Sequence, residues 1–126
     1  MRLAPDTNRY TDLARQVPEV VRTAATAGEL CLPFIVLAEL HQGFRNGSRR
    51  AENEDQLKRF LAQPGVRVWP DDATVDLYAT LAVQLRRQAT PIPTNDLWIA
   101  ALALQNGLTL YSRDHHFDHL SQIPRI

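Results

Sequence analysis

The chain has 126 residues with 14 basic and 14 acidic side chains, so its formal net charge is zero. This length suits one hydrophobic core, and we expect a single domain over residues 1–126. The apolar fraction of 44% is ordinary for a globular protein. No apolar run approaches the roughly 18 residues of a membrane span, and the first residues lack the apolar core of a signal peptide. We therefore expect a cytoplasmic protein with no membrane partner.

The basic side chains are almost all arginines, since Lys58 is the only lysine. Arginine binds phosphate in a bidentate manner better than lysine does, and Arg45, Arg49 and Arg50 form a cluster that suits such contacts. A solvated helix face explains the same cluster without any function, and zero net charge does not announce a nucleic-acid partner. The single cysteine, Cys31, cannot form an internal disulfide, so we expect it to be a small buried apolar residue.

The first third of the chain predicts a strand, two helices and a second strand. Residues 2–5 form a short apolar strand, which we expect to end at Ala4 because Pro5 would remove a ladder hydrogen bond. The capping residues Asp-Thr-Asn that follow begin a helix with apolar positions at 10, 13 and 17. Pro18 suits the first turn of the next helix, which Gly28 ends. Residues 30–36 predict a buried strand that leads into a third helix, with Pro33 near the boundary.

The rest of the chain continues this alternation of apolar strands and amphipathic helices. In order, we expect the third helix with Glu39 in its first turns, a charged helix over 48–63, a strand over 66–69, a helix capped by Asp71 or Asp72 that runs to about Gln88, a helix within 91–107, and a strand over 108–111. No internal repeat, linker or low-complexity segment interrupts the pattern.

One carboxylate, Asp96, lies at the start of the helix within residues 91–107. Thr94 or Asn95 can cap this helix, and Gly107 can end it in a left-handed turn. Asp96 then lies at the positive end of the helix dipole, which favours its ionised form with or without a function. Its importance therefore depends on which other side chains reach the same place.

Three further acids follow the predicted strands directly. Strands that alternate with helices form a parallel sheet, and such sheets carry their sites at the carboxyl ends of the strands. Asp6, Glu39 and Asp114 come just after the first, second and fourth strands, and Asp96 can reach the same rim. Clustered carboxylates repel one another and would take up protons unless a cation offset their charge. The oxygen ligands favour Mg²⁺ or Mn²⁺.

Four short motifs occur in the order and spacing of a known family. They are Asp6-Thr7-Asn8, Leu37-Ala38-Glu39-Leu40 with Gly43 and Phe44, Asn95-Asp96-Leu97-Trp98-Ile99-Ala100-Ala101, and Tyr111-Ser112-Arg113-Asp114 with Phe117. With these motifs the chain resembles the PIN-domain family over nearly its whole length, and more closely the VapC-type toxins of toxin–antitoxin pairs. The resemblance implies a three-layer α/β/α fold with a central parallel sheet of about four to five strands.

The resemblance also implies roles for particular residues. Asp6, Glu39, Asp96 and Asp114 correspond to the family's acidic metal-binding quartet, with Asp6 and Asp96 as the main ligands of Mg²⁺ or Mn²⁺. Thr7 and Ser112 match positions that often hold a hydroxyl near the metal, and Asn8 is a turn residue or a neighbour of the ligands. Arg113 joins the arginine cluster as a candidate contact to RNA phosphates.

From the family we expect a metal-dependent endoribonuclease that cleaves RNA as the toxin of a VapBC-like pair. The expected partners are an RNA substrate, a VapB-like antitoxin and a second copy of the chain. Some of the large side chains Trp69, Tyr78, Leu81 and Trp98 are candidates for a contact surface, although most belong in the core. No recognisable RNA-reading motif identifies the target.

Some features leave alternatives open. The family usually has an aliphatic residue before its first acid, so Pro5 allows a second hypothesis, a binding module that keeps the fold and the antitoxin interface but has lost catalysis. Asp118 is a second candidate for the fourth acid, although its position after Phe117 favours the surface. Histidines at 115, 116 and 119 raise the question of a zinc site, against a simple polar turn.

Overall fold

The computed structural model describes residues 1–69 and 74–126, apart from the side chain of Val75. The strands are β1 (Arg2–Pro5), β2 (Glu29–Pro33), β3 (Val66–Trp69) and β4 (Thr109–Tyr111). The helices are α1 (Thr7–Ala14), α2 (Pro18–Thr26), α3 (Phe34–Asn46), α4 (Arg50–Leu61), α5 (Thr74–Arg87) and α6 (Thr94–Gln105), followed by the short 3₁₀ helix η1 (His115–His119). The predicted cap at Asp71 or Asp72 lies outside the described residues.

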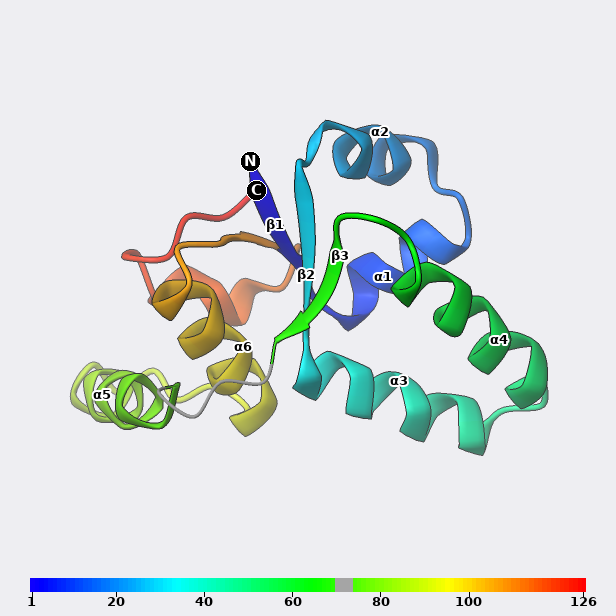
Figure 1. The fold of residues 1–126 in the computed structure, drawn as a ribbon. Coiled ribbons are helices and arrows are strands. Elements are labelled where there is room, and N and C mark those ends of the chain that lie inside the picture. The colour runs from blue at the N-terminus through cyan, green and yellow to red at the C-terminus, as the bar shows by residue number, and fades with distance from the viewer. Residues whose placement is uncertain (70–73) are drawn as a thin grey trace.

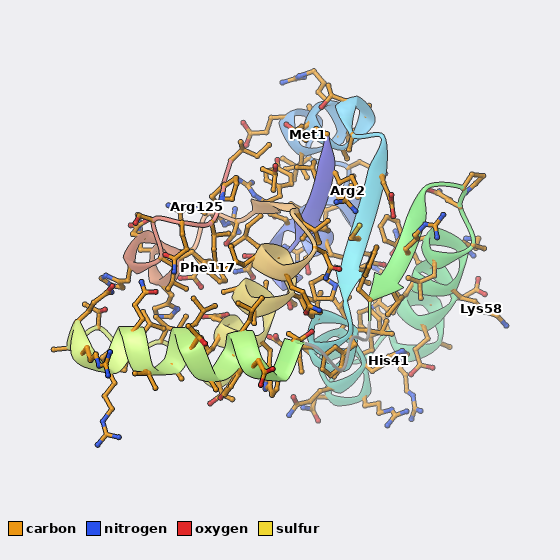
Figure 2. All side chains as sticks on the ribbon, turned by 60° about the vertical axis from the view of Figure 1, so that its left-hand side comes forward. Met1, Arg2, His41, Lys58, Phe117 and Arg125 are labelled. Carbon is orange, nitrogen blue, oxygen red and sulfur yellow. The ribbon has the colours of Figure 1, made fainter. Side chains whose placement is uncertain are left out.

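The strands form one parallel sheet in the order β3-β2-β1-β4. Leu3 of β1 is in register with Leu30 of β2 and Thr109 of β4, which puts β1 inside the sheet. Helices α5 and α6 lie on one side of the sheet and α1 to α4 on the other (Figure 1). Figure 2 shows Phe117 and Arg125 on the α6 side, with Lys58 far across the sheet on α4. The expected three-layer α/β/α fold with a parallel sheet is confirmed.

Two prolines, Pro5 and Pro33, are the last residues of their strands, and only the first shifts a predicted boundary. Pro5 belongs to β1, in register with Tyr111, so the expectation that the strand ends at Ala4 is wrong. As the last strand residue, Pro5 pairs in register with β4 alone, where its missing N–H is tolerated. Within residues 30–36, the strand ends at Pro33, near which we expected the boundary. Pro33, with a φ of −61° and a ψ of 139°, is the N-cap of α3, and residues 34–36 form the first turn of that helix.

Helix α6 forms the centre of one layer. Half of its 12 residues are buried, namely Leu97, Ile99, Ala100, Ala101, Leu102 and Ala103. Figure 1 shows α6 between the sheet and α5, which explains why it has apolar residues almost all round. Its N-cap is Pro93, without a side-chain cap, so the expected caps Thr94 and Asn95 are instead the first helical residues.

Of the side chains proposed for a contact surface, Leu81 lies in the core, and Tyr78 and Trp98 pack against each other between two helices. Leu81 is fully buried, and Tyr78 of α5 stacks on Trp98 of α6 with ring centroids 4.0 Å apart.

Cys31 is buried in β2, as expected, and burial raises the pKa of its thiol to about 11. Within the described ranges, the helices are all too short or too polar to span a membrane.

Candidate metal centre

The acidic residues meet where the strand order of the sheet reverses. The chain builds β1, β2 and β3 in one direction and then crosses back to add β4 on the other side of β1. A crevice forms at such a switch point outside the carboxyl ends of the strands. Asp6 follows β1, and Ser112 to Asp114 follow β4, so both segments enter this crevice from neighbouring strands.

A small pocket of about 130 Å³ occupies this crevice. It is lined by Asp6, Thr7, Asn8, Glu39, Asp96, Ile99 and Asp114. The four acids predicted from the sequence thus come together from the ends of β1 and β4 and from helices α3 and α6. The Thr7 hydroxyl is buried and has no hydrogen-bond partner among the described residues. The donor atoms facing the pocket are almost entirely oxygens, the ligand type that Mg²⁺ and Mn²⁺ prefer.

Asp6 is held in place from three directions. It is the N-cap of α1, where one carboxylate oxygen accepts a hydrogen bond of 2.9 Å from the Arg9 amide. Its own amide donates to the Tyr111 carbonyl, and its second carboxylate oxygen accepts from the Ser112 hydroxyl. With Pro5 in the strand before it, Asp6 still lines the pocket and is 6% exposed.

Glu39 and Asp96 face the pocket from opposite layers. Glu39 lies in the second turn of α3 and Asp96 in the first turn of α6. Burial, followed by the negative charge of Asp96, raises the pKa of Glu39 above its usual value. Burial also raises the pKa of Asp96, more than the hydrogen bond from His116 lowers it. The dipole of α6 favours ionised Asp96, whereas desolvation and the nearby carboxylates of Asp114 and Asp6 oppose ionisation and raise its pKa.

Asp114 completes the pocket and begins the next element. Its carboxylate accepts a hydrogen bond of 2.9 Å from the His116 amide and so caps η1. Its own amide donates to the Ser112 hydroxyl at 3.0 Å. The ring of His116 also faces the pocket acids, with Nδ1 2.8 Å from Asp96 Oδ2 and 3.1 Å from Asp114 Oδ1. From the sequence we considered His116 as part of a zinc site or of a polar turn, and neither hypothesis predicts its contact with these two acids.

Of the four arginines predicted to contact RNA, only Arg113 is next in sequence to a residue that lines the pocket. Arg113, between Ser112 and Asp114, forms an ion pair of 3.1 Å with the buried Asp12, which also lies 3.6 Å from Arg9. The other three arginines are exposed near the junction of α3 and α4 and do not line the pocket. There Arg49 pairs with Glu52, Arg50 pairs with Glu54, and Arg45 lies in the last turn of α3. Asp12 was not singled out from the sequence, because nothing in the local pattern of α1 indicates its partner Arg113.

The remaining candidates lie on the surface. Asp118 forms an ion pair with Arg125 and a hydrogen bond of 3.1 Å with His115, and it does not line the pocket. Hydrogen bonds from His115 and then Arg125 lower the pKa of Asp118. In the described parts of the chain, the only group of three or more possible metal-ligating side chains with close ligand atoms is Asp96, Asp114 and His116, so the three histidines do not form a zinc site together.

The fold and the pocket define a class: an α/β protein with a carboxylate cluster at the switch point of a parallel sheet. The chain belongs to the PIN domain family, whose model matches residues 6–123.

Two curated relatives and one solved structure illustrate the similarity. Ribonuclease VapC1 from Haemophilus influenzae is 28% identical over 113 residues, which cover 86% of this chain and 84% of that protein. Ribonuclease VapC4 from Mycobacterium tuberculosis is 30% identical over 84 residues, which cover 66% of this chain and 65% of the relative, just under two thirds of its length. The structure of VapBC-1 from nontypeable Haemophilus influenzae superposes with a TM-score of 0.88 at 24% identity, covering 100% of this chain and 97% of the other.

Proposed function

We propose that this protein is a metal-dependent endoribonuclease and the toxin of a VapBC-like toxin–antitoxin pair. The observation that carries the proposal is the convergence of Asp6, Glu39, Asp96 and Asp114 on one pocket at the switch point of the sheet. Membership of the PIN domain family and similarity to ribonucleases of the VapC type support the same activity.

The residues of the pocket fit a divalent cation. Burial and mutual repulsion raise the pKa values of Glu39 and Asp96, and a bound cation would offset the charge that causes this. The unpartnered Thr7 hydroxyl supplies a further oxygen at the same pocket. We propose Mg²⁺ or Mn²⁺, which when bound lowers the pKa of a water molecule and polarises the scissile phosphate.

The side chains around the pocket then have distinct roles. Asp6 and Asp96 are the main ligands, and Glu39 and Asp114 are ligands or orient the attacking water. Ser112 fixes the carboxylate of Asp6 through its hydrogen bond. Such support matters, because about 1 Å of misplacement can cost roughly a hundredfold in rate.

The charged surface supplies candidate contacts to the RNA backbone. Arg113 is 59% exposed and adjacent in sequence to Asp114, so we propose that its guanidinium, oriented by Asp12, binds a phosphate of the RNA. Arg45, Arg49 and Arg50 are proposed as contacts farther along the RNA, reached from the junction of α3 and α4.

We further propose a VapB-like antitoxin and a second copy of the chain as protein partners. An arginine of the antitoxin would suit the acidic pocket, where its guanidinium could replace the cation.

Val83, an apolar residue on α5 that is 48% exposed, is a candidate for the dimer contact. A monomer by light scattering at micromolar concentration would contradict the dimer.

The decisive experiment compares Asp96→Asn with Asp118→Asn in purified, antitoxin-free protein. Asp96→Asn should reduce Mg²⁺- or Mn²⁺-dependent RNA cleavage at least about a hundredfold with the circular dichroism spectrum unchanged, since it removes a ligand charge but keeps the shape. Asp118→Asn changes the same chemical group outside the pocket and should cleave at the wild-type rate. Cleavage by Asp96→Asn at the wild-type rate would disprove the site assignment.

The same preparation tests the alternative that Pro5 allows. A wild-type protein that binds its antitoxin but cleaves no RNA with either metal would favour the binding module over the enzyme. If cleavage occurs, mapping the cut ends in total RNA after controlled expression would identify the substrate.

A further inference from the structure

His116 occupies an unusual position between two of the pocket acids. Its ring Nδ1 lies 2.8 Å from Asp96 Oδ2 and 3.1 Å from Asp114 Oδ1. The ligand atoms of all three residues lie within 4.8 Å of one another. The imidazole thus bridges the segment after β4 and the first turn of α6, with a side chain that is 46% exposed and open to solvent.

The backbone fixes this position. The His116 amide donates to the same Asp114 carboxylate that the ring approaches, so both ends of the residue bind one acid. The next residue, Phe117, is 4% exposed and anchors η1 in the core. His115, one residue earlier, has a side chain that is 94% exposed and pairs only with Asp118 among the described residues. Two adjacent histidines therefore differ in their relation to the pocket.

The spacing of the donor atoms resembles a coordination shell. Two ligands at right angles around an ion with bonds of about 2.1 Å are about 3.0 Å apart. The distances from His116 Nδ1 to the two carboxylate oxygens, 2.8 and 3.1 Å, bracket this value. In the tautomer that carries its proton on Nε2, the ring offers the lone pair of Nδ1, and the three atoms can share one cation by small adjustments of the side chains.

We propose that His116 is a nitrogen ligand of the metal and shifts the selectivity of the site from Mg²⁺ toward Mn²⁺ and other first-row transition ions. Mg²⁺ binds oxygen ligands almost exclusively, whereas imidazole suits transition ions. A pocket of four carboxylates alone would not make this distinction so strongly. The inference rests on the metal site of the proposed function and specifies which ion that site prefers.

The test measures metal binding without RNA. Electron paramagnetic resonance follows free Mn²⁺ during titration of the wild type, His116→Gln and the matched control His115→Gln, and Mg²⁺ affinity comes from competition. Glutamine offers an amide oxygen that Mg²⁺ accepts. We expect His116→Gln to lose about tenfold in Mn²⁺ affinity with Mg²⁺ affinity changed less than about threefold, because a metal-site partner typically contributes about 10- to 100-fold. His115→Gln should match the wild type.

A second measurement detects the ligand directly. Pulsed electron paramagnetic resonance of the Mn²⁺-loaded protein should show coupling to a ¹⁴N nucleus in the wild type and His115→Gln, and none in His116→Gln. Equal loss or equal gain of affinity for both ions in His116→Gln, or no ¹⁴N coupling in the wild type, would overturn the inference while leaving the metal site intact. If the wild type bound neither ion, the metal dependence of the proposed function would fail as well.

Discussion

The Ser112 hydroxyl connects two of the pocket acids by playing two roles at once. It donates a hydrogen bond to the Asp6 carboxylate and accepts one of 3.0 Å from the Asp114 amide. Ser112 is 4% exposed, so water cannot easily replace either bond. The hydroxyl therefore holds the end of β1 and the end of β4 in one arrangement, and both acids depend on it.

We expect Ser112→Ala to lower the free energy of unfolding by about 1–3 kcal/mol, because a buried acceptor and a buried donor lose their partner. Mn²⁺ affinity should fall about 10- to 100-fold, as it does when other residues that orient metal ligands are removed. Urea denaturation and Mn²⁺ titration measure the two effects. The matched control is Ser121→Ala, which makes the same change at an exposed position. Equal stability and equal Mn²⁺ affinity in the two variants would show that the hydroxyl has no such role.

Helix α6 has two roles, because its buried side chains pack in one layer of the fold and its first turn carries Asp96. Leu102 is 1% exposed, whereas Leu104, two residues later, is only partly buried. Leu102→Ala should cost about 2–5 kcal/mol, through lost burial and the cavity that remains. Leu104→Ala is the matched control with a clearly smaller loss, and chemical denaturation compares them. A loss for Leu104→Ala as large as that for Leu102→Ala would contradict the packing described for α6.

The elements of this fold follow from local patterns, and the convergence of the acids follows from topology. Asp6 and Asp114 were predicted at one rim because the carboxyl ends of parallel strands meet there. The boundary near Pro33 was predicted correctly, because proline suits the junction of a strand and a helix. The contact between His116 and Asp96 was missed, because it joins residues 20 positions apart and no local sequence pattern indicates it.

For the molecule as a whole, the acidic pocket couples stability to pH and to cations. Glu39 and Asp96 have raised pKa values, and Asp6, Asp114 and the ring of His116 face them from other elements. A carboxyl group with a higher pKa in the folded state binds more protons when folded than when unfolded. The metal-free protein should therefore lose stability as pH rises from about 4 through the raised pKa values.

A cation in the pocket should reverse this loss, because it offsets the charge that appears when the carboxyl groups ionise. We expect Mg²⁺ or Mn²⁺ at ten times its dissociation constant to add about 1.4 kcal/mol of stability at pH 7.5, a Tm rise of about 3–6 °C. The increment should shrink as pH falls toward 4.5, where protons compete for the same oxygens. Thermal unfolding at each pH, with NaCl of equal ionic strength as the control, measures it.

The variants separate the pocket from the rest of the surface. Asp96→Asn should lose most of the metal-dependent increment at pH 7.5, whereas Asp118→Asn should keep it, because Asp118 engages His115 and Arg125 outside the pocket. An increment that stayed constant between pH 4.5 and 7.5, or that persisted unchanged in Asp96→Asn, would locate the bound cation elsewhere on the molecule. If the stability added by the cation depended on pH and required Asp96, the cation would bind at the acidic pocket. Its binding would then offset the repulsion between the carboxylates at the switch point of the sheet.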